Sequence, residues 1–188
     1  MLVVQCFSQS NGLDYRELKQ PYYIDSWFNM DTPLGEVINY TDSIITLKDF
    51  DDKLIILDFW FTGCTVCIRQ FPKEINLQKK YRNKIQFVLV TNDSKKVVTN
   101  FLNKWRSKNG SKLPFPIVVS DTLLKKAFRH LYDPHYGWLF PDGKIIGQTS
   151  EHFVTKKNIL ELLKLWKKKK KHYEKRRQEL LKNPIIQN

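Results

Sequence analysis

Two cysteines three positions apart, Cys64 and Cys67, constrain this chain more than any other feature of its sequence. Residues 54–61 before them are apolar except for Asp58 and are typical of a buried strand. Residues 66–81 after them repeat apolar side chains at helical spacing. Cys64 is therefore expected to open a helix after a strand and a short turn, with Cys67 one turn later on the same face. Unpaired N–H groups and the helix dipole favour a thiolate at such a position.

The rest of the chain alternates between strand and helix patterns. Two short extended pieces, residues 37–40 and 44–47, enclose a turn-like Thr41-Asp42-Ser43 and predict a β-hairpin. Alternation of this kind predicts an α/β fold, with a central sheet and helices on both faces. Further strands are expected at residues 85–90, 116–119, 136–140 and 144–148, and further helices at 94–110, at 121–128 and from 155 onward.

A pair of cysteines can serve metal binding or redox chemistry. A structural zinc site needs four ligands, so the Cys64–Cys67 pair would require two more at suitable spacing. The third cysteine, Cys6, stands alone, and His130 and His135 do not have zinc-finger spacing. The placement between a strand and a helix favours a redox dithiol. We therefore expect no metal and no cofactor.

Asp58 interrupts an otherwise apolar strand six residues before Cys64. A buried carboxylate is costly unless it has a partner or a role. Beneath a dithiol it could take or relay the proton of Cys67, with its pKa raised by burial. An aspartate that simply faces solvent is the alternative, and the strand pattern leaves both open because both faces are apolar.

Three motifs follow one another along the chain. Residues 45–50 read Ile-Thr-Leu-Lys-Asp-Phe ahead of the first buried strand, and residues 58–60 read Asp-Phe-Trp ahead of the two cysteines. Pro134 stands seven residues before Pro141, which opens a Pro-Asp-Gly-Lys turn. In this order the three motifs resemble the TlpA/ResA-like family of thiol-disulfide oxidoreductases, and the resemblance covers roughly residues 36–166. It implies a thioredoxin-like three-layer α/β/α sandwich with a central mixed sheet and an N-terminal β-hairpin.

The resemblance also implies roles for individual residues. Cys64 would be the exposed attacking thiolate and Cys67 the more buried resolving thiol, with Asp58 as the buried acid. Pro134 would be a cis-proline opposite the dithiol, where the backbone of Asp133 pairs with an extended substrate. A cis bond occurs at only about 5–6% of X-Pro bonds, so it needs such a reason.

The chain departs from the family pattern around the dithiol. Thr65-Val66 stands between the cysteines where thioredoxin has Gly-Pro, so the redox potential cannot be transferred. Gly63 replaces the usual tryptophan before the first cysteine. Asp133 precedes the proline where the family more often has Thr, Val or Leu, and a carboxylate near Cys64 would oppose its ionisation.

The net charge of +13 is concentrated at the C-terminus. Residues 167–188 hold nine Lys or Arg and two Glu, a net +7. We divide the chain into a leader at 1–35, which could retain part of an export signal, a domain at 36–166 and a basic helical tail at 167–188. A solvated helix extension is one interpretation of the tail and contact with an anionic membrane surface another. No nucleic-acid motif accompanies it, so we expect no nucleic-acid partner.

Two functions remain open at this stage. The first is a thiol-disulfide oxidoreductase, acting as a reductase of disulfide-containing proteins. The family implies a place in the cell envelope facing the periplasm, with or without a membrane tether, and a membrane-bound electron donor. The second is a thioredoxin-fold binding module with an inactive dithiol. The presence of Cys64, Cys67 and Asp58 together favours the enzyme.

Overall fold

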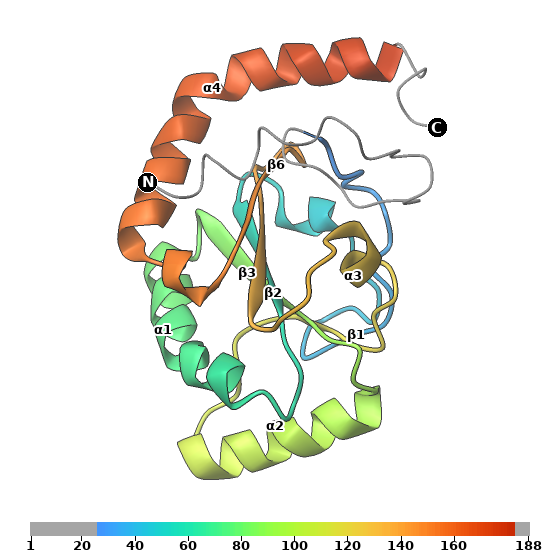
Figure 1. The fold of residues 1–188 in the computed structure, drawn as a ribbon, viewed down its shortest axis with the longest axis vertical. Helices are drawn as coiled ribbons and strands as arrows, with labels where there is room; N and C mark the ends of the chain where they lie inside the picture. Colours follow the sequence, from blue (N-terminus) through green and yellow to red (C-terminus); the bar gives the residue numbers. More distant parts are fainter. Residues whose placement is uncertain (1–25, 183–188) are drawn as a thin grey trace.

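A computed structural model describes residues 26–182, which build a six-stranded sheet with helices packed against it (Figure 1). The strand order is β1-β4-β3-β2-β5-β6. The strands are β1 (Val37–Ile38), β2 (Leu54–Phe59), β3 (Ile85–Val90), β4 (Ile117–Val118), β5 (His135–Leu139) and β6 (Ile145–Thr149). The α-helices are α1 (Thr65–Tyr81), α2 (Lys95–Asn109), α3 (Leu124–Ala127) and α4 (Lys156–Lys182), and the short 3-10 helices are η2 (Leu47–Phe50) and η3 (Glu151–Phe153).

The sheet is mixed, as the sequence predicts. β2 pairs in parallel with β3, and β3 pairs in parallel with β4. β1, β5 and β6 join antiparallel to β4, β2 and β5 respectively. β2 is therefore central, and Asp58 near its end lies between Leu89 of β3 and Tyr136 of β5.

The two faces of the sheet are covered by different kinds of structure. Leu54, Ile56 and Trp60 pack in one apolar cluster with residues of α1, α2 and α4. Ile55 and Leu57 pack on the opposite face with α3, η2 and the chain around residues 28–34. Figure 1 shows α1 and the first half of α4 on one side of the sheet and α3 on the other. We call these the α1 face and the α3 face.

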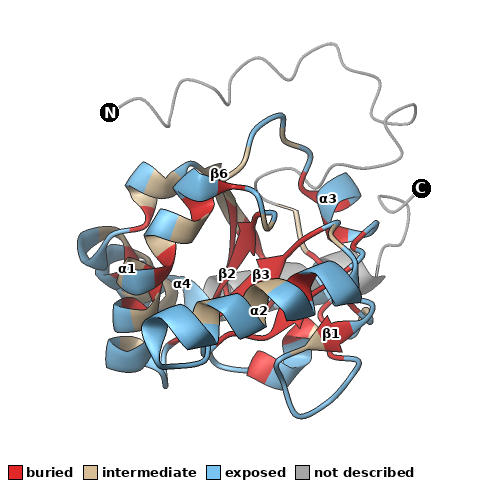
Figure 2. Ribbon diagram, turned by 90° about the horizontal axis from the view of Figure 1, so that it is seen from below, coloured by how far each residue is buried: buried red, intermediate tan, exposed pale blue. Residues whose placement is uncertain are grey.

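Helices cover both faces, as predicted, but unequally. The three long helices share the α1 face, whereas α3 has only four residues. Figure 2 shows buried residues in the strands and exposed residues along the outer side of α2. Both faces of β2 are therefore buried, which is why its sequence is apolar without alternation.

The helix that follows the dithiol is fixed to the sheet by aromatic and amide contacts. Phe71 of α1 packs against Trp60, with ring centroids 5.3 Å apart, and against Trp105 of α2 at 5.5 Å. Gln78 of α1 donates to Ile85 O at 3.1 Å and accepts from Phe87 N at 2.9 Å. These contacts fix the position of α1 over β2 and β3.

The N-terminal hairpin is shorter than predicted. Its first arm is β1, but its second arm is reduced to an isolated bridge between Glu36 and Ile44. The Asp49 carboxylate accepts a hydrogen bond from Thr46 N at 2.7 Å and caps η2. Leu47 therefore begins a 3-10 helix where we expected a strand. β1 pairs with β4 and not with a second hairpin strand.

The ordered core extends beyond the predicted domain limits. Phe28, Met30 and Leu34, which the sequence placed in the leader, are buried against the α3 face. α4 runs through residue 166 without a break. The three-part division of the chain stays a prediction, and residues 1–25, with Cys6 and the expected signal remnant, lie outside the described residues. In the described part, no helix has both the length and the apolarity needed to cross a membrane.

Candidate active site

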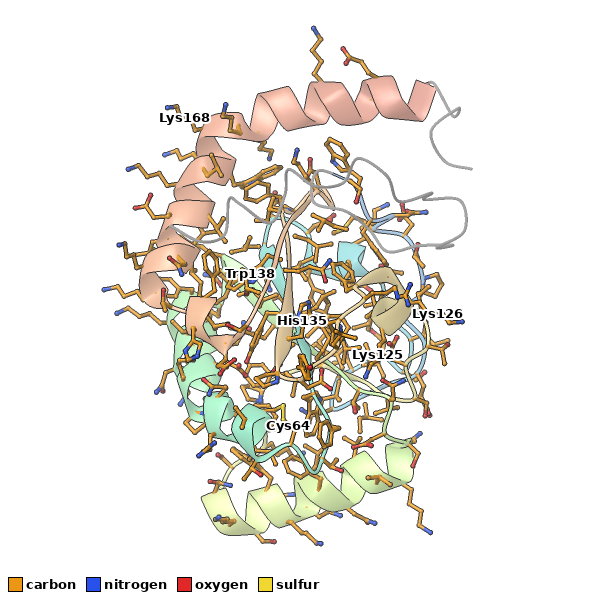
Figure 3. The ribbon with its side chains drawn as sticks, in the orientation of Figure 1. Cys64, Lys125, Lys126, His135, Trp138 and Lys168 are labelled. Carbon is orange, nitrogen blue, oxygen red and sulfur yellow. A yellow bond between two sulfur atoms is a disulfide. The ribbon has the colours of Figure 1, made fainter. Side chains whose placement is uncertain are left out.

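Cys64 and Cys67 form a disulfide at the start of α1 (Figure 3). Their Cα atoms lie 5.3 Å apart, inside the range of about 4.4–6.8 Å that a disulfide permits. Cys64 is the N-cap of α1, and its Sγ accepts a hydrogen bond from the backbone N–H of Cys67 at 3.1 Å. Cys64 is 6% exposed and Cys67 is fully buried. The order of burial agrees with the prediction, although in the disulfide Cys64 is itself nearly buried.

The turn that leads into Cys64 is held from the neighbouring strand. Trp60 N donates to Val90 O at 3.0 Å, and Thr62 N donates to the carboxylate of Asp93 at 2.7 Å. Asp93 lies in the loop after β3, and its backbone N–H is fixed by Thr91 Oγ1. The sequence analysis missed Asp93, because 31 residues separate it from the turn that it binds.

The predicted proline loop lies at the same end of the sheet as the dithiol. The Asp133–Pro134 peptide bond is cis, and β5 begins at the next residue, His135. His135 is paired with Phe59, the last residue of β2, from which the chain continues towards Cys64. The sheet therefore brings Pro134 to the end of β2 from which Cys64 follows.

The Asp133 carboxylate is neutralised by its neighbours. It lies 2.9 Å from His130 Nε2 and 3.9 Å from Lys125 Nζ. His130 Nδ1 lies 2.6 Å from the carbonyl oxygen of Phe128. Burial raises the pKa of Asp133, but the hydrogen bond and charge of His130, together with the charges of Lys125 and His135, outweigh it, so the pKa is lowered.

This arrangement answers the concern that a carboxylate at residue 133 would oppose thiolate formation. The negative charge of Asp133 is paired with His130, which the sequence analysis had considered only as a zinc ligand. His135 stacks on His130 with ring centroids 4.3 Å apart, and its Nε2 is 2.9 Å from Gln148 Oε1. Burial is the main cause that lowers the pKa of His135 to about 4. His135 is therefore neutral at physiological pH.

Asp58 is fully buried on the α1 face, which settles the alternative left open by its strand pattern. Burial raises its pKa well above the ordinary value, and the nearby Glu74 carboxyl raises it further. Neither oxygen of Asp58 has a donor among the protein groups of the described region. A carboxyl in this setting is held neutral and can exchange a proton.

Glu74, which the sequence analysis missed, is the second buried carboxyl of the site. It is fully buried in α1, and its Oε1 accepts a hydrogen bond from Tyr136 Oη at 2.6 Å. Burial raises its pKa to about 7, against the hydrogen bond from Tyr136 and the charge of Lys73, which lower it. Cys67, Phe71 and Glu74 follow the spacing of one helical face, so this residue could have been recognised as inward-facing from the sequence.

The structure thus places the predicted residues in two groups at one end of the sheet. Cys64 and Cys67 begin α1, and Asp58 lies in the strand that leads to them, with Glu74 as its partner. Asp133 and Pro134 form the loop before β5. Among the described residues, no three His, Cys, Asp or Glu side chains gather closely enough to hold a metal ion. The chemistry that this arrangement supports is thiol-disulfide exchange coupled to proton transfer.

Comparison with known proteins gives a matching sequence family. The Redoxin family matches residues 38–160. The chain is 29% identical over 123 residues to the thiol-disulfide oxidoreductase ResA of Bacillus thuringiensis subsp. konkukian, covering 64% of this chain and 67% of that one. It is 28% identical over 105 residues to the ResA of Bacillus subtilis, covering 54% and 55%.

Solved structures give the same fold. A thiol-disulfide isomerase from Corynebacterium glutamicum aligns with a TM-score of 0.58 at 16% identity, covering 74% of this chain and 96% of that one. The exposed lipoprotein thioredoxin Etrx1 of Streptococcus pneumoniae aligns with a TM-score of 0.54 at 21% identity, covering 71% and 97%. At these identities the likeness concerns the fold, which is thioredoxin-like, as the sequence motifs implied.

Proposed function

The chain belongs to the Redoxin family and is a thiol-disulfide oxidoreductase, and on this premise we propose that it reduces disulfides in protein substrates through Cys64 and Cys67. The observation that carries the proposal is the hydrogen bond from Cys67 N to Cys64 Sγ at the first turn of α1. After reduction, the same N–H group and the helix dipole stabilise a thiolate on Cys64.

The proposed reaction has two exchange steps. The Cys64 thiolate attacks one sulfur of the substrate disulfide, and the other substrate sulfur leaves as a thiolate, which gives a mixed disulfide. The Cys67 thiol then loses its proton and attacks Cys64 Sγ. The second substrate sulfur leaves with the electron pair, and the Cys64–Cys67 disulfide forms. Two electrons pass from the dithiol to the substrate, and a thiol donor must return them.

Three further residues have proposed roles in these steps. Asp58 in its ionised form would accept the Cys67 proton, because it is buried in the strand that leads to the dithiol and no described residue donates a hydrogen bond to it. Pro134 and the backbone of Asp133 would bind an extended stretch of substrate beside the sulfurs. Pairing of the Asp133 carboxylate with His130 supports this, since it removes an uncompensated charge from the loop.

We place the protein in the cell envelope, facing the periplasm and supplied with electrons by a membrane-bound donor. One structural relative, Etrx1, is an exposed lipoprotein. The basic tail would contact anionic lipid headgroups, because Lys167, Lys168 and Lys169 are exposed on α4. Each lysine near such a surface is worth about 1 kcal/mol of attraction.

The test of the proposed activity is reduction of insulin by dithiothreitol. The wild-type protein should accelerate the reaction, and Cys64→Ser should abolish the acceleration because the attacking thiolate is lost. Cys6→Ser is the matched control, and it should keep full activity. A wild-type protein no faster than dithiothreitol alone would favour the binding module with an inactive dithiol.

A further inference from the structure

The site contains a second buried acid, Glu74, which has no role in the two exchange steps described above. Its side chain is fully buried on the α1 face, on the helix that starts at the dithiol. A buried glutamate without a complete set of partners costs free energy, so a sequence that keeps one needs a compensating contact or role.

Three of the four carboxyl oxygens of Glu74 and Asp58 receive no hydrogen bond from a described residue. Tyr136 donates to Glu74 Oε1, but Glu74 Oε2 and both oxygens of Asp58 find no donor among the described residues. Two ionised carboxylates can only accept, so Asp58 and Glu74 can bond to each other only when one of them is protonated. A single shared proton gives a donor to Glu74 Oε2 and removes one of two repelling charges.

The proton belongs on Asp58. With Tyr136 on one oxygen and the Asp58 hydroxyl on the other, the Glu74 carboxylate accepts two hydrogen bonds, whereas Asp58 as the anion would accept one at most. Hydrogen bonds to the charged form favour that form. The pKa directions agree, since that of Asp58 is raised well above its ordinary value and that of Glu74 reaches about 7.

We propose that Glu74 is a positioning residue that acts through Asp58: with Tyr136, it keeps the Asp58 carboxyl protonated, so that a carboxyl pair controls when the Cys67 proton can be taken up. The inference rests on the proposed role of Asp58 as the acceptor of that proton. In the mixed disulfide, Asp58 accepts the proton from Cys67 Sγ only after the pair has released its own proton to solvent. Cys67 then attacks Cys64 Sγ and the substrate thiolate leaves, which completes the exchange.

Other charged groups face the pair from each packed element, and they stay in place in every variant below. Lys73 on α1 opposes the raised pKa values of both carboxyls, and Asp133 before β5 adds to that of Asp58. Glu151 of η3 acts on Tyr136, and its backbone oxygen accepts from Lys73 Nζ at 3.1 Å. None of them donates a hydrogen bond to Asp58.

The experiment uses Ellman's reagent with the reduced full chain in a Cys6→Ser background. The first release of thionitrobenzoate reports attack by Cys64, and the second reports attack by Cys67 on the mixed disulfide. In Glu74→Gln the amide can donate to the Asp58 carboxylate, which then ionises more readily. The pH profile of the second phase should therefore move down by about one pH unit or more, with the first phase unchanged.

Two companion variants separate this role from a merely structural one. Tyr136→Phe removes the donor that stabilises the Glu74 anion, so the second-phase profile should move to higher pH, opposite to Glu74→Gln. In an Asp58→Asn background, Glu74→Gln should move nothing further. The exposed Glu161→Gln is the matched control and should behave as wild type. An unmoved second-phase profile in Glu74→Gln, or an equal shift without Asp58, would overturn the inference.

An infrared measurement tests the shared proton without any activity. Wild type at neutral pH should show the carbonyl band of a protonated carboxyl, and Asp58→Asn should lose the Asp58 contribution to it. In Glu74→Gln the Asp58 band should disappear at a lower pH than in wild type, because burial still raises the pKa of Asp58 but the Glu74 carboxyl no longer adds to it. If wild type gives no second phase at any pH, the proposed function fails, and the infrared result still decides the carboxyl pair. A band that titrates at the same pH in Glu74→Gln as in wild type would refute the role of Glu74.

Discussion

Asp58 and Asp121 are both buried aspartates on different faces of the sheet. Only the Asp121 carboxylate accepts hydrogen bonds from its neighbours. The Asp121 carboxylate accepts backbone N–H groups of Leu123, Leu124 and Lys125 at 3.2, 2.9 and 2.8 Å, at the start of α3. The Asp58 carboxyl accepts none. A satisfied buried carboxylate stabilises a fold, whereas an unsatisfied one costs free energy.

The same division extends to the other buried polar groups of the described chain. Every buried side-chain atom without a partner lies on the α1 face, in Asp58, Glu74, Trp60 and Trp105. The α1 face also carries Cys64 and Cys67. The unsatisfied polar groups therefore lie on the face that carries the dithiol, as expected if the α1 face gives up stability for the proton transfer proposed above.

The largest expected difference between the faces is in the pH dependence of stability. The folded protein holds the Glu74 proton more tightly than the unfolded chain does, because the pKa of Glu74 rises from 4.5 to about 7. This contribution is fully present below pH 4.5 and is lost as the pH rises through 7. The loss amounts to about 3 kcal/mol, and the raised pKa of Asp58 acts in the same direction.

Urea unfolding at a series of pH values measures this difference. The free energy of unfolding of Glu74→Gln should depend less on pH than that of wild type. Glu161→Gln, at an exposed position of α4, is the matched control. Parallel curves for wild type and Glu74→Gln would break the comparison.

A smaller effect is expected from the satisfied carboxylate. Asp121→Ala leaves three backbone N–H groups of α3 without an acceptor, and such caps are worth about 1–2 kcal/mol. The free energy of unfolding should fall by that amount, with the rates of both thionitrobenzoate phases unchanged. Lys48→Ala removes an exposed ion pair with Asp31 and should cost under about 1 kcal/mol, as a control. A changed exchange rate in Asp121→Ala would contradict the division between the faces.

Much of the fold could be predicted because its patterns are local. The apolar run of β2, the helical spacing of α1 and the Gly110 stop of α2 each lie within one segment, and the structure confirms them. The Thr46–Asp49 cap is equally local and favours a helix start at Leu47. The apolar pattern of residues 44–47 led us to predict a strand there instead. Residues 28–34 pack on the α3 face as an irregular segment, so no periodicity marks them as core.

The candidate site was predictable in its chemistry and not in its long-range partners. The two cysteines, Asp58 and Pro134 stand in recognisable motifs of adjacent residues. Asp93 reaches the turn before Cys64 from another strand, and His130 reaches Asp133 through a bent loop. The Asp93 contact depends on how strands are ordered in the sheet, and the His130 contact depends on the bends at residues 131–134; residue spacing along the chain encodes neither.

Trapping of the exchange intermediate in Cys67→Ser tests the central claim most directly. The reduced Cys67→Ser protein is mixed with a disulfide-containing protein such as insulin, and the products are identified by mass spectrometry under non-reducing conditions. Attack survives in this variant but resolution does not, so the account predicts a stable adduct through Cys64. The Cys64→Ser, Cys67→Ser double variant should give none. No adduct at Cys64, or an adduct that persists in the double variant through Cys6, would contradict the account.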